Sequence, residues 1–441
     1  MSWFTGTSTD YLDLASKLVQ LATRDSVVSA TLGAGGSGYA IGDILTVSGG
    51  TFGPTAAKIR VLTLSGSAVA TFKVQEGGGY TAAPSNPAST TGGTGTGATF
   101  NLTLADTGWT ALRDTTWAGG SGSEKEVILE GTGAGSDAIT VGLRTFRRTV
   151  GLDTAYSWAL NGMTGFNSGL AYEDQPGVSP GALPNASSAG GAYVPLHNGG
   201  TAGGLTALAY WLSITSRRIE GVVRMQDSTV VHYSSFYLGF MNPFNSAVEW
   251  PYPILVAGCS AFRDALYDDQ GAPTFTGLTE MIGINGLVGP CFFRKPDSTW
   301  VTAVNSLATI SPTDRAAYTQ YGIFPGNEGV TPGGADAVVG LGNFGWHTII
   351  RNTGIPGAAT LNVRPTPDSG GAKYPTIPAT LQMTTTSGPD RDMLGELDGV
   401  FWIPHHGITR EDYARNGDDR YRVFPCGNRN ELYSLFAIKE E

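Results

Sequence analysis

The sequence predicts a mainly β protein: a β-sandwich or barrel-like main domain, one short N-terminal helix and a small inserted Gly-rich β domain. Glycine supplies 63 of the 441 residues, roughly twice its usual share of about 7%. Charged residues make up 15% of the chain, against about 25% in an ordinary globular protein. Short runs of Val, Ile, Thr and aromatic residues alternate with Gly-rich turns, a pattern typical of many short strands.

The strongest helix signal lies at residues 8–23. Ser8 is the expected N-cap, and Asp10 and Asp13 suit the positive end of a helix. Apolar residues recur at helical spacing through this segment, namely Tyr11, Leu14, Leu18, Leu21 and Ala22. We expect this apolar face to dock on the protein's own domain or on a neighbouring subunit.

An abrupt change in composition suggests three parts. Residues 27–104 have almost no charge and carry alternating apolar runs between paired glycines, so we predict a small β-sandwich or barrel module of about six strands. The module looks inserted, because residues 1–26 and 105–441 read as one main domain, with a possible division near residue 290. Within the module, GGSGYAIGD and EGGGYTAAP form a weak repeat that places Tyr39 and Tyr80 at matching positions.

The main domain reads as a series of strands. EVILEG and AITVGLR, separated by a Gly-Ser-Asp turn, predict a hairpin. Residues 165–207 are rich in Gly, Ser, Pro and Asn, and a loop of this length is expected to make contacts in an assembly. Residues 209–258 have the highest density of strand signals and are predicted to form the central sheet. Short strands are expected from 290 to 440, and ELYSLFAIKEE predicts a terminal strand.

The charge balance and cysteine usage exclude several classes of protein. The net charge is −10 with a pI near 5.0, and no basic run exceeds two arginines, so nucleic acid is not an expected partner. Neither a signal peptide nor an apolar run of about 18 residues is recognisable, so membrane insertion is not expected. The three scattered cysteines fit neither a disulfide framework nor a zinc site, and indicate folding in a reducing cytoplasm. They are Cys259, Cys291 and Cys426.

Two patterns resemble cofactor or metal sites. Residues 33–38 match G-x-G-x-x-G, but a strand-like, Gly-broken segment follows where a dinucleotide site needs a helix, so a turn is the favoured interpretation. His405 and His406 lie close in sequence to Asp398 and Glu411. Adjacent residues on a strand point to opposite faces, so a hydrogen-bonded pair is favoured over a metal site. We therefore expect no cofactor and no metal.

Acidic clusters raise the possibility of glycoside hydrolysis, which needs two carboxylates facing one cleft. In sequence, however, the clusters are flanked by Gly or Asn, and Asp is common in such turns, so solvated turns are favoured. A calcium site at Asp418 and Asp419 is a weaker alternative, since the D-x-[DN]-x-[DN]-G loop is absent. The clusters comprise Asp264, Asp268 and Asp269; Asp392, Glu396 and Asp398; and Asp418 and Asp419.

No catalytic residue is assigned. Nucleophile-elbow and phosphate-loop motifs are missing, and we expect no enzyme activity. The aromatic stretch at 233–252 could stack on a glycan, but core and subunit interface are favoured. The residues predicted to form an interface are Tyr11, Leu14, Leu18, Phe236, Tyr237, Phe244, Trp250 and Tyr252.

Several segments resemble structural proteins of tailed bacteriophages. They are FTGTSTDYLDLASKLVQLAT, GWTALRD, EVILEGTGAGSDAITVGLRT and FYLGFMNPFNSAVEWPYPILVAG. The stretch from GSGYAIGDILTVSGG to GGTGTGATFNLT looks like a small β module that recurs in phage tail, collar and fibre-type proteins. Together these segments cover about half the chain. The resemblance implies a place in the virion, assembled in the host cytoplasm, with copies of this chain and other virion proteins as partners, but it brings no catalytic residue.

Three functions from different classes follow. The first is a structural subunit of the tail, baseplate or collar, with the helix at 8–23 and the loop at 165–207 at interfaces. The second is a receptor- or glycan-binding tail adhesin whose module at 27–104 touches the host surface. The third is an envelope polysaccharide depolymerase that uses one of the carboxylate clusters.

Overall fold

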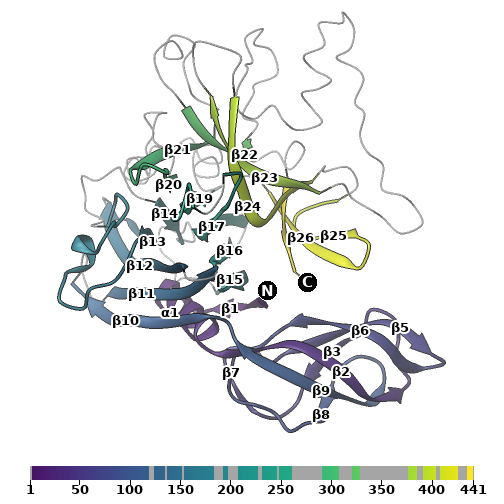
Figure 1. Ribbon diagram of the computed structural model, residues 1–441. Coiled ribbons are helices and arrows are strands. Elements are labelled where there is room, and N and C mark those ends of the chain that lie inside the picture. Colours follow the sequence, from purple (N-terminus) through teal and green to yellow (C-terminus); the bar gives the residue numbers. More distant parts are fainter. Residues whose placement is uncertain are drawn as a thin grey trace, which may run out of the picture.

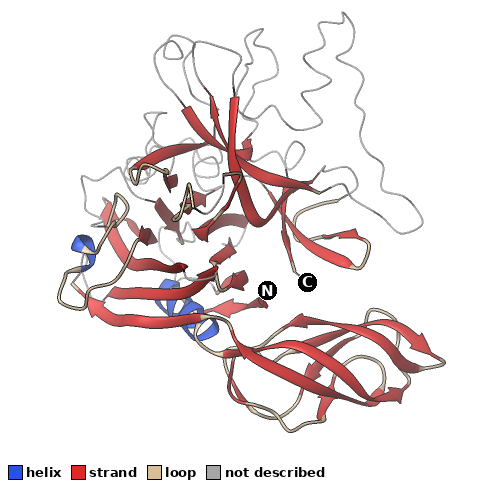
Figure 2. Ribbon diagram, in the orientation of Figure 1, coloured by secondary structure: helices blue, strands red, loops and turns tan. Residues whose placement is uncertain are grey.

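The computed structural model describes most of the N-terminal half and separate strands of the C-terminal half. The described residues form three sheets and one α-helix (Figure 1 and Figure 2), which confirms the prediction of a mainly β protein. The described ranges are 2–118, 124–134, 137–150, 153–182, 192–196, 207–226, 231–245, 248–260, 291–306, 320–327, 376–384, 391–403, 408–425 and 435–440.

Helix α1 (Tyr11–Ala22) follows strand β1 (Ser2–Ser8) after a two-residue turn. Asp10 is its N-cap, because its carboxylate accepts hydrogen bonds from the backbone N–H groups of Leu12 and Asp13, each at 2.8 Å. The prediction that Ser8 caps the helix is wrong. Ser8 ends β1 instead, and its hydroxyl donates to the carboxylate of Asp13. Within the described part of the chain, no helix is long and apolar enough to cross a membrane.

A five-stranded antiparallel sheet carries the predicted hairpin. Its order is β10 (Trp109–Trp117), β11 (Glu124–Ala134), β12 (Asp137–Val150), β13 (Asp153–Met163) and β14 (Ala192–Pro195). The pairing of β11 with β12 confirms the hairpin. β14 lies inside the segment predicted to be a loop, so that prediction is wrong for these four residues. Ala192, Tyr193 and Val194 are buried, and this burial outweighs the loop-like composition around them.

A second sheet of fourteen strands runs through the main domain. Strands β15 to β19 confirm the prediction that residues 209–258 are dense in strands, and β27 confirms the predicted terminal strand. β19, before residue 290, pairs with β20, after it. The order is β1, β15 (Leu208–Thr215), β16 (Arg218–Gln226), β17 (Val231–Phe240), β19 (Ile254–Ser260), β20 (Cys291–Arg294), β21 (Trp300–Ser306), β22 (Gln320–Asn327), β23 (Ile377–Thr384), β24 (Arg391–Ile403), β27 (Leu435–Lys439), β26 (Asp419–Pro425) and β25 (Tyr413–Asn416), with β18 (Asn242–Pro243) on β24.

The strands β15, β16, β17 and β19 form the middle layer of the main domain. Side chains on a strand alternate between its two faces. On β15, Tyr210 and Leu212 point to one core together with α1 and the five-stranded sheet. Trp211 points the other way and packs with Phe424 and Ile438 of the C-terminal strands. Both faces of this layer are therefore buried, which explains the nearly continuous apolar run at 208–214.

Residues 25–106 form a third sheet of eight strands with its own apolar core (lower right in Figure 1). The ends of this sheet lie two residues outside the predicted module at 27–104. The order is β4 (Thr51–Phe52), β7 (Tyr80–Ala82), β2 (Asp25–Ser37), β9 (Thr96–Asp106), β8 (Ala88–Thr91), β3 (Ile44–Val47), β5 (Lys58–Ser65) and β6 (Ala68–Glu76).

The weak sequence repeat corresponds to a structural repeat. Tyr39 and Tyr80 are both buried, and each hydroxyl accepts a backbone hydrogen bond, from Ala98 at 3.1 Å and from Ala57 at 2.9 Å. In chain order, the principal strands of the first half are β2, β3 and β5, and those of the second half are β6, β8 and β9. Exchanging each strand with its counterpart (β2 with β6, β3 with β8, β5 with β9) leaves the pairings in the sheet unchanged. The module is therefore built from two similar halves related by an approximate two-fold arrangement.

Candidate functional site

The outer face of the five-stranded sheet carries a dense group of polar side chains. Strand alternation places Glu126 of β11, Arg144 of β12 and Asn161 of β13 on the face opposite the main core. Glu126 and Arg144 are directly paired across the two strands. Residues 165–182 cover this face, with Met163, Tyr172 and Ala182 forming a small apolar cluster beneath the covering segment.

Tyr172 anchors the covering segment to the sheet. It lies in the short 3-10 helix η1 (Tyr172–Asp174), and its side chain is fully buried. Its ring occupies space that a side chain at Gly142 would fill, because a Cβ there would lie 2.3 Å from the Tyr172 hydroxyl. The hydroxyl donates to Asn161 Oδ1 at 3.2 Å. Burial raises the pKa of Tyr172, so the hydroxyl keeps its proton.

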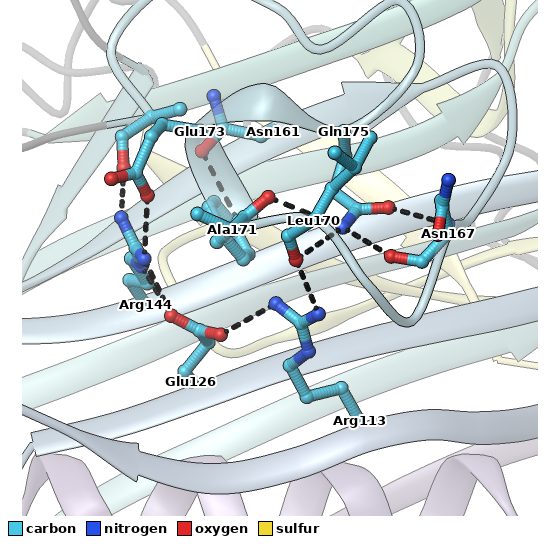
Figure 3. Close-up of polar contacts among 11 residues, drawn as sticks. Arg113, Glu126, Arg144, Asn161, Asn167, Leu170, Ala171, Glu173 and Gln175 are labelled. Carbon is cyan, nitrogen blue, oxygen red and sulfur yellow. Dashed lines mark hydrogen bonds and ion pairs between the residues drawn. The ribbon is translucent and has the colours of Figure 1, made fainter.

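Arg144 holds the segment from the centre of the polar group (Figure 3). Its Nε and Nη2 donate to Glu126 Oε2 at 2.8 and 2.5 Å, and Nη2 also donates to Glu173 Oε2 at 2.9 Å. Its Nη1 donates to the carbonyl of Ala182 at 2.8 Å. The guanidinium carbon lies 4.2 Å from the ring centroid of Tyr172. Ion pairing, hydrogen bonding and cation–π contact thus hold Tyr172 and Glu173 of η1 and Ala182 at the end of the segment.

Arg144 also contacts a second aromatic ring, that of Trp117 on β10, at 4.4 Å from the centroid. Arg113 of the same strand bridges sheet and loop, since its Nη1 donates to Glu126 Oε1 at 2.9 Å and its Nη2 to the carbonyl of Leu170 at 2.8 Å. We call Arg113, Glu126, Arg144, Tyr172 and Glu173 the loop clamp.

Gln175 closes the loop on itself, as Figure 3 shows. Its Nε2 donates to the carbonyls of Asn167 and Leu170, at 2.9 and 3.1 Å, and its Oε1 accepts from the backbone N–H of Asn167 at 2.8 Å. Leu170 remains 37% exposed at the outside of this turn. Of the predicted loop at 165–207, residues 165–182 do form a loop around η1. The clamp joins residues that lie far apart in the sequence, so the sequence alone could not locate it.

A second polar group is buried between the middle layer and β24. Arg218 lies within 2.7 Å of Glu220 and donates from Nε to Asp398 Oδ2 at 3.0 Å. Tyr237 completes the group, since its hydroxyl accepts from the backbone N–H of Asp398 at 3.3 Å. Burial raises the pKa of Tyr237 and of Glu220. This group ties the two layers together.

The residues predicted to form an interface lie at different depths. Tyr11, Leu14 and Leu18 belong to the core beneath α1, and the Tyr11 hydroxyl donates to Glu124. Phe236, Tyr237 and Trp250 are buried in the cores on either side of the middle layer, and Tyr252 packs at the edge of one of them. Phe244 is 52% exposed. An interface that uses these positions stays a prediction, with Phe244 as its accessible member.

Two of the acidic clusters lie at least partly among the described residues. Asp398 lies on β24, so the prediction that the Asp392–Asp398 cluster is a solvated turn is wrong. Gly395 allows the strand to pack closely there, since a Cβ would lie 2.6 Å from the carbonyl oxygen of Asn242. Asp419 accepts from Lys73 and Lys439. Asp264, Asp268, Asp269, His405, His406 and Cys426 lie outside the described residues.

Residues 33–37 of the G-x-G-x-x-G match lie on β2 and only Gly38 follows it, so the prediction that the match is a turn is wrong for these five residues, and the next element is the strand β3. Among the residues that the structure places, no group of three His, Cys, Asp or Glu side chains is arranged to hold a metal ion. No protein-family model matches the chain, and no curated protein matches it.

Proposed function

We propose that this protein is a structural subunit of a tailed-bacteriophage virion that assembles in several copies at the tail, baseplate or collar. The resemblance of its sequence segments to such proteins supports the location. The layered β fold, with the middle layer buried on both faces, supports a scaffolding role.

The loop clamp is the observation that carries the proposal. A Gly- and Pro-rich segment would ordinarily lose conformational entropy when it binds a partner. Here the clamp has already fixed residues 167–182 on the sheet through Arg144 and Arg113. A loop ordered in advance makes contacts at lower entropic cost, as an assembly subunit requires.

The charged side chains also favour a scaffold over a depolymerase. Glu126 is bound by Arg144, Asp398 by Arg218, and Glu411 by Arg224 at 2.8 Å. A glycosidase instead needs two carboxylates directed at substrate and water. Carboxylates that are paired with arginine in this way hold layers and loops together instead.

The test measures incorporation into particles. A Leu170→Asp variant places a charge on the exposed turn of the clamped loop, and an Ile41→Asp variant places one on the module, where Ile41 is 68% exposed. Both should fold with the wild-type Tm. When each is supplied to a phage that lacks the gene, mass spectrometry of purified particles should find Ile41→Asp present and Leu170→Asp depleted at least tenfold, the effect of about 1.4 kcal/mol at an interface. Equal incorporation of both would contradict a contact-making role for the loop.

The module supports adhesion as a second candidate, because it has its own sheet and core. Ser26 and Ala105 pair across β2 and β9, so deleting residues 27–104 would join two neighbouring positions. An adhesin would lose adsorption on this deletion while particles still assemble. Release of sugars from host envelope material by the purified protein would instead support the depolymerase.

A further inference from the structure

The module and the main domain have separate apolar cores. The core of residues 25–106 and the core beneath α1 have no residue in common among the described residues. Two parts of one chain that do not share a large apolar interface usually move relative to one another.

The pivot lies where the chain enters and leaves the module. Asp25 at the start of β2 pairs with Asp106 at the end of β9, so both crossings lie side by side. Arg24 Nη1 donates to the carbonyl of Gly53 at 2.6 Å, which fixes the end of the module next to α1. Just outside the module, Thr107 Oγ1 donates to the carbonyl of Ala22 and holds the two crossing segments together.

A third contact at this end is buried. Thr5 of β1 donates from its hydroxyl to Glu76 Oε1 at 2.9 Å, and Lys58 of the module donates to the same oxygen at 2.8 Å. Glu76 is 2% exposed. Breaking this contact would leave a buried charge with fewer partners, so the pivot itself is expected to persist.

A separate contact lies farther along β6. Lys73 Nζ is 3.1 Å from Asp419 Oδ1 at the start of β26, and the other carboxylate oxygen, Oδ2, is 2.8 Å from Lys439 Nζ. The three side chains are 29%, 37% and 31% exposed. Exposed ion pairs contribute little to stability and weaken further as salt screens them.

We propose that the Lys73–Asp419 pair is a salt-sensitive latch, and that the module swings about the Asp25–Asp106 pivot when the latch opens. The closed position is the one in the structure. In the open position Asp419 keeps Lys439, so the C-terminal hairpin stays folded while the module moves as one body. The latch concerns the chain's own motion and does not depend on the function proposed above.

The test measures a distance between the module and the C-terminal hairpin. Spin-labelled non-natural residues are placed at Ser65 and Asn416, which are exposed and end strands β5 and β25, so that the natural cysteines are left unchanged. Pulsed electron paramagnetic resonance on the full chain should give one main distance at low salt. Lys73→Gln should add a longer distance and raise the ratio of open to closed molecules about threefold, as loss of an exposed ion pair predicts. One molar NaCl should do the same to the wild type.

Two further variants separate the latch from a general effect of lost charge. Lys73→Arg keeps the pair and should restore the closed distance. Lys295→Gln breaks a comparable exposed pair with Asp297, at 2.7 Å, elsewhere in the main domain and should change nothing. An unchanged distance distribution in Lys73→Gln and in high salt would overturn the latch, as would an equal change in Lys295→Gln.

Discussion

The guanidinium of Arg218 lies 2.7 Å from the carboxylate of Glu220, between Nη1 and Oε1, where solvent reaches at most 1% of either side chain. Asp398 approaches the same guanidinium from β24 and is 37% exposed. One always-charged arginine therefore joins two strand layers through two acidic side chains. Four predictions concern this group and the loop clamp.

Removing the buried cation should be costly. Arg218→Met leaves Glu220 and Asp398 without their shared partner, and we expect the free energy of unfolding to fall by about 3 kcal/mol or more. Arg224→Met is the matched control, because the Arg224–Glu411 pair is 32% and 24% exposed, and an exposed pair is worth about 1 kcal/mol or less. Urea unfolding followed by fluorescence measures both. Equal losses of unfolding free energy in the two variants would show that the buried arginine stabilises the fold no more than the exposed one.

Stability should decrease with rising pH because of Glu220. Burial raises its pKa from 4.5 to about 8; nearby Arg218 opposes the shift and Asp398 adds to it. Between these two values the folded protein keeps a proton that the unfolded chain has released, so stability falls as pH rises. Urea unfolding between pH 5 and 8 should show a loss of about 3 to 4 kcal/mol that Glu220→Gln removes. Parallel pH profiles for the two proteins would contradict the assignment.

Gly399 should tolerate no side chain. Its φ of +79° lies in the left-handed region, and a Cβ would lie 2.1 Å from Arg218 Nη2. Gly399→Ala should therefore lower stability by about 2 kcal/mol or more. Gly417 has a similar φ of +66° but no atom within 4 Å of its Cβ position, so Gly417→Ala should cost only about 1 kcal/mol from backbone strain. Thermal unfolding compares the two variants. An equal shift in Tm would contradict a clash between a side chain at position 399 and Arg218.

The clamp should control how fast the loop exchanges hydrogen. Arg144→Gln removes two ion pairs and two cation–π contacts, so exchange in peptides covering residues 165–182 should accelerate roughly tenfold. Lys125→Gln breaks a more exposed pair with Asp114 on the same sheet, 2.5 Å long, and should leave these peptides unchanged. Mass spectrometry of the peptides measures this hydrogen exchange. Unchanged rates in Arg144→Gln would mean that packing of Tyr172 alone holds the loop.

Periodicity in the sequence predicts the main features of this fold. The apolar spacing from Tyr11 to Ala22 predicts α1, and the change in composition near residues 27 and 104 predicts the module. Local turn chemistry predicts the β11–β12 hairpin. These features depend on residues close together in the chain, which is why one sequence suffices to find them.

The remaining features depend on contacts between distant residues. Ser2–Ser8 becomes a strand because it pairs with β15, about two hundred residues away in the chain. Arg144 and Arg218 occur in the sequence as ordinary arginines, and only the folded sheets bring Glu173 and Asp398 to them. Asp10 replaces Ser8 as the cap because β1 extends to Ser8. In each of these cases, contacts between distant residues determine the local structure.

The central claim is that the protein is a multi-copy part of a phage particle. Immunogold electron microscopy of intact, purified particles, with antibodies against this chain, tests it most directly. We predict gold at one discrete position, a ring at the collar or a cluster at the tail end, in several copies per particle. Particles that carry no label and no peptides of this chain would contradict the claim.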